Sequence, residues 1–288
     1  MKPAPFEYVC PRSLEEALDV LGRHGDEAKV LAGGQSLVPM LNMRLARPAV
    51  IIDINRVAGL DGIVESGRSL HVGALVRQRS LERVAVIRAR APLLAEAAPL
   101  IGHLQTRARG TVCGSVAHAD PAAELPACLV ALAAVYQVTG ARGQRRVPAA
   151  DFQGGLFTTV LEADEVLTAI EVPASPWPRV GTAFAEVARR HGDFALAGAA
   201  AVVAQDDEGT CRDVRLVFFA VGDTPHLAAA TSVLLGARDD KSIDDVARVA
   251  AGELDPHSDL HASGAYRRRV AAALARQTLA TAWARACR

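Results

Sequence analysis

Two adjacent glycines, Gly33 and Gly34, separate a short apolar run from a predicted helix. The run at residues 29–32 predicts a buried strand, and residues 37–43 predict the start of a helix with Ser36 as its N-cap. Glycine lets the backbone adopt positive φ and come close to a ligand. A strand, a glycine turn and a helix start present free backbone N–H groups to a phosphate, although a tight turn without a ligand would need the same residues.

The bulk composition excludes several classes of protein. The chain has 288 residues, enough for two or three subdomains with a sizeable core. Lys plus Arg and Asp plus Glu each number 32, so there is no basic excess to favour nucleic acid, and any anion binding must be local. Five scattered cysteines without a Cys-x-x-Cys pair fit neither a disulfide framework nor a self-contained zinc or iron–sulfur site. Residues 1–11 do not resemble a signal peptide and no apolar run could span a membrane, so we expect a cytoplasmic protein.

The first part of the chain predicts two small α/β units. Ser13 and Glu16 form a capping box, which starts a helix that ends at Gly22 or Gly25. Further strands are predicted at residues 49–54, 70–74 and 166–172, a hairpin at 136–139 and 145–147, and helices over 75–101 with breaks at Pro92 and Pro99. The first unit closes near residue 57.

A second glycine-containing segment, Thr-Val-Cys-Gly-Ser, occupies residues 111–115. Residues 116–117 are expected to continue it as a strand. A turn is predicted at residues 120–124, followed by a helix that starts at Pro126, because proline inside a helix would delete a hydrogen bond. This arrangement would leave the Glu124 carboxylate in an irregular segment, free to accept hydrogen bonds.

The proline-rich residues 173–178 predict a linker and the main domain boundary. Beyond it, strands are predicted at residues 184–188, 199–204 and 212–220, and helices at 226–235, 242–251 and 265–286. A turn at residues 206–209 makes the last two strands antiparallel. Residues 179–288 therefore predict an α+β domain with a three-stranded antiparallel sheet and a helical layer.

The two glycine segments together with residues 119–126 (Ala-Asp-Pro-Ala-Ala-Glu-Leu-Pro) resemble the flavoprotein, or medium, subunit of the molybdenum hydroxylases. This group includes carbon monoxide dehydrogenase, the bacterial N-heterocycle hydroxylases and the flavin domain of xanthine dehydrogenase. The resemblance runs over essentially the whole chain. Further matching segments are residues 6–8, 41–48, 102–103, 165–167 and 189–195.

The resemblance implies an α+β fold that begins with an FAD-binding domain of the type shared by p-cresol methylhydroxylase (PCMH) and vanillyl-alcohol oxidase (VAO). That domain would comprise residues 1–175, in two α/β subdomains of about residues 1–57 and 58–175, and a separate C-terminal domain would comprise residues 179–288. FAD would be bound non-covalently, because Gln35 stands where a covalent attachment would need a histidine.

The resemblance also implies roles for individual residues. The first glycine segment (residues 29–37) would bind the adenosine-diphosphate part of FAD, and the second glycine segment (residues 111–115) would approach its pyrophosphate. Glu124 would hold the sugar-alcohol region, and Phe194 belongs to a mobile loop that screens one face of the flavin. The expected cofactor-binding residues are Lys29, Val30, Leu31, Ala32, Gly33, Gly34, Gln35, Ser36, Leu37, Ile101, Gly102, Thr111, Val112, Cys113, Gly114, Ser115, His118, Glu124 and Leu167.

Some of these residues have a plainer interpretation. Cys113 stands where the family commonly has glycine, and it is either a small buried residue or a redox thiol. For His103 and His118, a packed or hydrogen-bonded role is expected ahead of a catalytic one. We expect neither a catalytic residue nor a metal site on this chain.

The implied function is that of one part of a three-component enzyme. A large partner subunit would carry molybdopterin, a small partner would carry two [2Fe-2S] clusters, and FAD on this chain would pass electrons to an external acceptor. A dimer of heterotrimers is the assembly that the resemblance implies. The alternatives are a self-sufficient flavin oxidase of the same fold and a non-catalytic assembly protein that has lost FAD.

Overall fold

The structure, a computed structural model, describes residues 2–288. Its first unit is a three-stranded parallel sheet in the order β1-β3-β2, formed by β1 (Glu7–Val9), β2 (Ala28–Leu31) and β3 (Val50–Asp53). Helix α1 (Leu14–His24) begins at the predicted cap, where the Ser13 hydroxyl accepts from the Glu16 N–H, and ends at Gly25. The short elements η1 (Gly25–Glu27), α2 (Leu37–Asn42) and η2 (Ile54–Arg56) complete the unit.

The second unit is a five-stranded antiparallel sheet in the order β4-β5-β10-β6-β7. Its strands are β4 (Ile63–Ser66), β5 (Ser69–Gly73), β6 (Val135–Gly140), β7 (Gly143–Pro148) and β10 (Glu165–Pro173). The predicted hairpin is confirmed as β6 and β7. A minor two-stranded sheet pairs β8 (Gln153–Gly155) with β9 (Thr158–Thr159) after the turn η4 (Ala149–Asp151).

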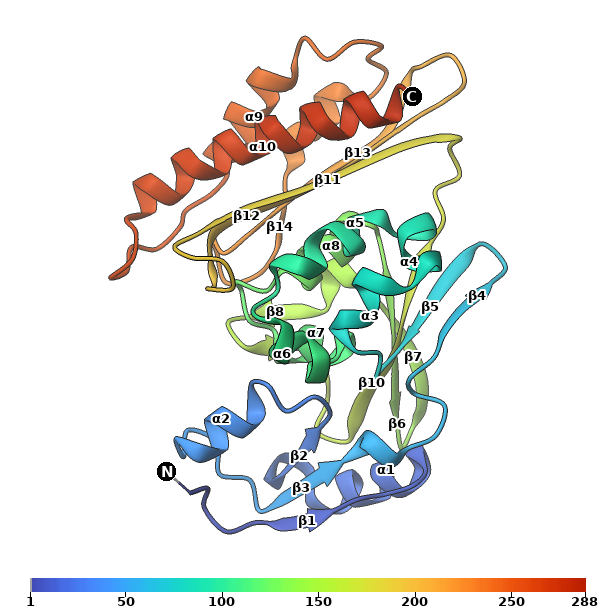
Figure 1. Cartoon of the computed structure of the whole chain (residues 1–288), viewed down its shortest axis with the longest axis vertical. Coiled ribbons are helices and arrows are strands. Elements are labelled where there is room, and N and C mark those ends of the chain that lie inside the picture. The colour runs from blue at the N-terminus through green and yellow to red at the C-terminus, as the bar shows by residue number, and fades with distance from the viewer. Residues whose placement is uncertain (1) are drawn as a thin grey trace.

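Short helices pack between this sheet and the C-terminal part of the chain (Figure 1). They are α3 (Gln78–Arg83), α4 (Ala85–Arg90), α5 (Pro92–Ala97), η3 (Ala98–Leu100), α6 (Leu104–Arg109), α7 (Val112–His118) and α8 (Glu124–Ala131). The breaks expected at Pro92 and Pro99 are confirmed, because Pro92 opens α5 and Pro99 lies in η3. Residues of both layers join one hydrophobic cluster, so the helices and the sheet share a core.

The C-terminal part is a four-stranded antiparallel sheet formed by β11 (Arg179–Ala188), β12 (Ala195–Gln205), β13 (Cys211–Phe219) and β14 (His226–Leu227). Helices α9 (Ile243–Gly252) and α10 (Gly264–Ala286) cover its outer face (Figure 1). Strand β12 is buried along its whole length. Alternate side chains such as Ala201 and Val202 therefore belong to two different cores, one under α10 and one against the short helices.

Four sequence predictions about elements were wrong. The segment at residues 226–235 is not a helix: it adds β14 to the edge of β13 and continues as η5 (Ala229–Leu234), so the sheet has four strands rather than three. Residues 116–117 lie in α7 rather than in a strand. Helix α8 starts at Glu124, two residues before Pro126, because proline is tolerated in a first turn, where its missing N–H has no helical partner. Ser36 does not cap α2, because it already has helical backbone angles and its side chain makes no capping hydrogen bond.

Within residues 2–288 no helix is both long enough and apolar enough to cross a bilayer. The same residues contain no group of three or more His, Cys, Asp or Glu side chains suited to a metal ion.

Candidate cofactor site

The first glycine segment runs from β2 into α2 at the carboxyl end of the parallel sheet. Gly34 has a φ of 73°, in the left-handed region that favours glycine, and its carbonyl oxygen accepts from the Val38 N–H at 3.0 Å. The backbone N–H groups of residues 33–36 make no hydrogen bond with any described residue. A row of unpaired amides is the donor set that a phosphate requires, so this segment fits the FAD that the sequence predicts.

Gly33 has a different role from Gly34. A Cβ built on Gly33 would lie 2.5 Å from the carbonyl oxygen of Arg109 and 2.7 Å from the Cα of Gly110. Both contacts are with backbone, which cannot move aside as a flexible side chain can. Gly33 is therefore required first for the approach of the two glycine segments to each other.

The second glycine segment is a helix N-terminus rather than a loop. Thr111 has an extended backbone and caps α7, where its Oγ1 accepts from the Gly114 N–H at 3.1 Å. A Cβ on Gly114 would come within 2.5 Å of that oxygen, so the cap itself needs glycine there. The same Cβ would lie 4.0 Å from the Cβ of Ala32, which places the two glycine segments side by side.

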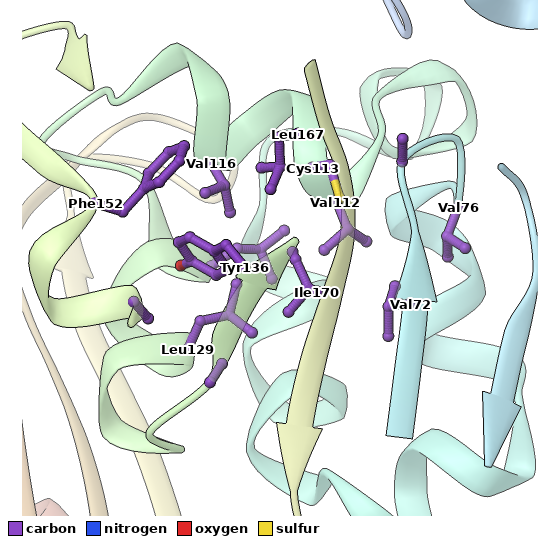
Figure 2. Packing of buried hydrophobic residues seen from close by; sticks show 14 of the residues in the cluster. Val72, Val76, Val112, Cys113, Val116, Leu129, Tyr136, Phe152, Leu167 and Ile170 are labelled. Atoms are coloured by element: carbon purple, nitrogen blue, oxygen red, sulfur yellow. The ribbon is translucent and has the colours of Figure 1, made fainter. Parts of the chain in front are cut away.

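The side chains of Cys113 and Leu167 are buried in the protein core. Figure 2 shows both side chains among Val112, Val116 and Ile170. Cys113 is 2 % exposed, and burial raises the pKa of its thiol. Cys113 therefore fits the role of a small buried residue better than that of a redox thiol.

The buried guanidinium of Arg107 fixes the backbone at Ile101 and Gly102. Arg107 Nη1 donates to the carbonyl oxygens of both residues, at 2.9 and 3.0 Å, while its Nε donates to Glu82 at 2.6 Å. Gly102 has a φ of 46°, and Ile101 is buried. The expected cofactor-packing pair is thus a rigid turn whose carbonyl oxygens are already satisfied.

The loop that carries Phe194 packs on His103, the residue that follows Gly102 in the sequence. A Cβ on Gly192, whose φ is 88°, would lie 2.5 Å from His103 Cε1, so the loop backbone lies directly over the imidazole. Phe194 itself is 73 % exposed. His118 lies farther along, with its ring 5.1 Å from that of Phe157. The structure thus brings the Phe194 loop to the expected flavin end of the site.

Glu124 is buried at the first position of α8, not in an irregular segment as the sequence predicted. Burial raises the pKa of Glu124 to about 7, and the Asp120 carboxylate adds to that rise, while its own backbone N–H and Arg107 oppose it. Asp120 instead forms the predicted turn, where its Oδ1 accepts from the Ala122 N–H at 2.9 Å. A carboxyl in this state can donate as well as accept a hydrogen bond near neutral pH.

Sequence reasoning missed three polar residues near the site. Asn55 and Arg77 lie between the two glycine segments. Glu186 lies on β11, and its buried Oε2 has no hydrogen-bond partner among residues 2–288. The sequence signal for Asn55 was its position, because it is a polar residue directly after the strand predicted at residues 49–54. Nothing in the local sequence marks Arg77 or Glu186, because their importance depends on contacts made across the fold.

Two family models match the chain in succession. One, described as the FAD binding domain in molybdopterin dehydrogenase, matches residues 4–175, and the other, the CO dehydrogenase flavoprotein C-terminal domain, matches residues 182–282. The chain is an FAD-binding medium subunit of the molybdenum hydroxylase family. The resemblance noted from the glycine segments is thereby confirmed, as is the α+β fold class.

Relatives of this medium subunit belong to enzyme complexes. The chain is 41 % identical to the alpha subunit of the 6-hydroxypseudooxynicotine dehydrogenase complex of Paenarthrobacter nicotinovorans, over 99 % of this chain and 97 % of that one. It is similar to carbon monoxide dehydrogenase from Hydrogenophaga pseudoflava, with 40 % identity, a TM-score of 0.95 and 99 % of each chain covered. It is also similar to quinoline 2-oxidoreductase from Pseudomonas putida 86, with 36 % identity, a TM-score of 0.93 and 100 % of each chain covered. The medium subunit is thus a flavoprotein component of an oxidoreductase.

Proposed function

We propose that this medium subunit is the electron-transfer component of its complex and binds FAD across the junction of the two glycine segments. The observation that carries the proposal is the pairing of unbonded amides at residues 33–36 with the capped N-terminus of α7, two segments in backbone contact. FAD bound there would take electrons from [2Fe-2S] clusters on a small partner subunit and deliver them to an external acceptor.

The residues of this chain bind and screen the cofactor in the proposal. The amides of the two glycine segments would take the pyrophosphate, as phosphate binding without bulk charge requires. Glu124 would hydrogen-bond the sugar-alcohol chain, and the rigid Ile101–Gly102 turn would pack against the isoalloxazine. Phe194, exposed on a loop anchored at His103, would control access to it. None of these residues needs to act as an acid, base or nucleophile.

The proposal also covers domains, partners and compartment. Residues 1–175 would form the FAD-binding domain, in subdomains of about residues 1–57 and 58–175, and residues 179–288 the C-terminal domain. A large molybdopterin subunit and a small [2Fe-2S] subunit would complete a heterotrimer that dimerises. Free thiols at all five cysteines within residues 2–288 support a reducing compartment such as the cytoplasm.

The test is to purify the native complex gently, record its absorption spectrum and identify the co-purifying chains. The proposal expects flavin bands together with two partners, one with iron–sulfur absorption and one with molybdenum. Flavin bands on a chain that purifies alone and oxidises an alcohol or amine would overturn it in favour of a self-sufficient oxidase. A colourless chain that cannot be reconstituted with FAD would overturn the cofactor assignment itself.

A further inference from the structure

One bridge of polar side chains joins the two glycine segments. Arg77 Nη1 donates to the carbonyl oxygen of Arg109 at 2.7 Å, and Arg77 Nη2 donates to Asn55 Oδ1 at 2.7 Å. Asn55 Nδ2 then donates to the carbonyl oxygen of Ala32, also at 2.7 Å. Ala32 directly precedes the glycine pair of the first segment, and Arg109 lies two residues before Thr111, where the second segment begins.

The orientation of the Asn55 amide follows from its partners. A guanidinium can only donate and a backbone carbonyl can only accept, so the amide must turn its oxygen to Arg77 and its nitrogen to Ala32. Neither aspartate nor leucine could serve both partners. The Arg77 fork is equally specific, because lysine has no planar pair of donors to reach a carbonyl and an amide together.

The bridge is anchored in the parallel sheet. Asn55 lies in η2, directly after β3, where Asp53 Oδ1 accepts from both the backbone N–H and the side-chain amide of Asn55, at 2.9 and 2.6 Å. Asp53 Oδ2 in turn accepts from the Tyr8 hydroxyl at 2.5 Å. Burial opposes ionisation of Asp53, but the bonds from Tyr8 and Asn55 outweigh it and hold the pKa of Asp53 below its usual value.

The bridge and the glycine contact meet at one atom. The Arg109 carbonyl oxygen that accepts from Arg77 is the atom that a Cβ on Gly33 would strike at 2.5 Å. Strand-like pairing of Arg77 with Thr111 fixes the backbone on the other side, where the Gln78 N–H donates to the Gly110 carbonyl oxygen at 2.9 Å. The spacing of the two segments is therefore set by contacts in which no ligand takes part.

We propose that Asn55 and Arg77 are positioning residues that hold the two glycine segments at one spacing, so that both can engage the pyrophosphate of FAD together. The inference rests on the proposed function, in which these segments bind that group. Preorganised donors bind more tightly than donors that must first be ordered, so loss of the bridge lowers affinity for FAD without removing any proposed ligand contact.

The experiment measures FAD binding to the deflavinated full chain of the wild type and of two variants, Arg77→Lys and Asn55→Asp. Arg77→Lys keeps the charge and loses the fork, whereas Asn55→Asp keeps the acceptor for Arg77 and loses the donor to Ala32. Each variant is expected to raise the Kd for FAD roughly 10- to 100-fold. The ³¹P resonances of the pyrophosphate in the FAD-saturated variants are expected to shift from the wild-type positions.

Arg268→Lys is the matched control, because Arg268 also joins a carbonyl oxygen, that of Leu254, to a side chain, that of Asp255, but does so in the C-terminal part of the chain. It should leave both Kd and ³¹P resonances unchanged. Wild-type Kd and unshifted resonances in the bridge variants would overturn the proposal, and so would a fall in apoprotein Tm of more than about 5 °C, which would assign the bridge to general stability. If Gly34→Val also retains FAD, the loop assignment itself fails; if Gly34→Val loses FAD while the bridge variants retain it, only the positioning role fails.

Discussion

A side chain on Gly33 would collide with the carbonyl oxygen of Arg109, since a Cβ there would lie 2.5 Å from it. This contact between the middle of the first glycine segment and a residue two positions before the second explains why the glycines at residues 33 and 34 cannot be treated as equivalent. Gly33 permits the contact of two backbones, whereas Gly34 supplies a positive φ.

Gly33→Ala is expected to destabilise the apoprotein by about 1–3 kcal/mol, because a methyl group must displace backbone, and to weaken FAD binding severely. Gly34→Ala is expected to cost only about 1–2 kcal/mol from its left-handed φ, because its Cβ would meet just the side-chain ends of Leu31 and Val38 at 3.1 Å. Urea denaturation and FAD titration measure the two effects.

Gly22→Ala in α1, where a Cβ would have nothing within 4 Å, should bind FAD normally and stabilise the chain slightly. Equal effects at Gly33 and Gly22 would contradict the assignment.

Thr111→Val is expected to lower the stability of the apoprotein by about 1 kcal/mol, because it removes the hydroxyl that caps α7, and to weaken FAD binding as the first turn frays. Thr111→Ser should restore both properties. Ser263→Ala is the matched control, since Ser263 caps α10 by accepting from the Tyr266 N–H at 3.2 Å. It should cost a similar amount of stability in urea denaturation but leave the Kd for FAD unchanged. An equal loss of FAD affinity in Ser263→Ala would show that stability alone governs cofactor binding.

The order of elements was largely predictable from the sequence, because caps, prolines and apolar runs act locally. Ser13 and Gly25 bound α1 as expected, and the hairpin of β6 and β7 follows from its glycine turn. The errors lie where tertiary contacts override local pattern. Edge pairing with β13 converts residues 226–227 into a strand, and Glu124 joins a helix whose first turn tolerates Pro126.

The candidate site was predictable in part. The two glycine segments carry a sequence signature, and the structure places them in contact. The Asn55–Arg77 bridge has no such signature, because the residues it joins are brought together only by the fold. Leu167, which the resemblance implies as a flavin contact, is 4 % exposed and lies in the core beside Cys113 (Figure 2).

The stability of the apoprotein should fall as pH rises from about 4.5 to about 8. Burial raises the pKa of Glu186 from 4.5 to about 8, with a further rise caused by the Glu124 carboxylate, and the pKa of Glu124 stands at about 7. The folded state thus keeps protons that the unfolded state releases above its lower pKa. Stability is fully present below pH 4.5 and declines through the folded pKa values, by at most ~1.4 kcal/mol per pH unit for each group.

Glu186→Gln is expected to flatten this decline and to raise stability at pH 9, because it removes a charge whose buried Oε2 has no hydrogen-bond partner in the part of the chain that the structure describes. Urea denaturation of the apoprotein between pH 5 and pH 9 measures the slope. Glu171→Gln serves as a control, because Glu171 is an ion-paired carboxylate that accepts from Arg146 at 2.8 Å. It should leave the slope above pH 6 intact. A wild-type slope in Glu186→Gln would remove this carboxyl as the cause.

Phe194→Ala is expected to expose bound FAD without changing the fold. The side chain is 73 % exposed, so its removal should alter the free energy of unfolding by no more than about 0.5 kcal/mol. Iodide quenching of flavin fluorescence should become stronger and reoxidation of the reduced protein faster, because the aromatic ring no longer screens the cofactor. Phe194→Tyr should behave like the wild type. Leu260→Ala, which removes a fully exposed side chain from the C-terminal part of the chain, controls for nonspecific effects. If Phe194→Ala and Leu260→Ala quench alike, the loop does not screen the flavin, and access to the cofactor must be controlled by another part of the complex.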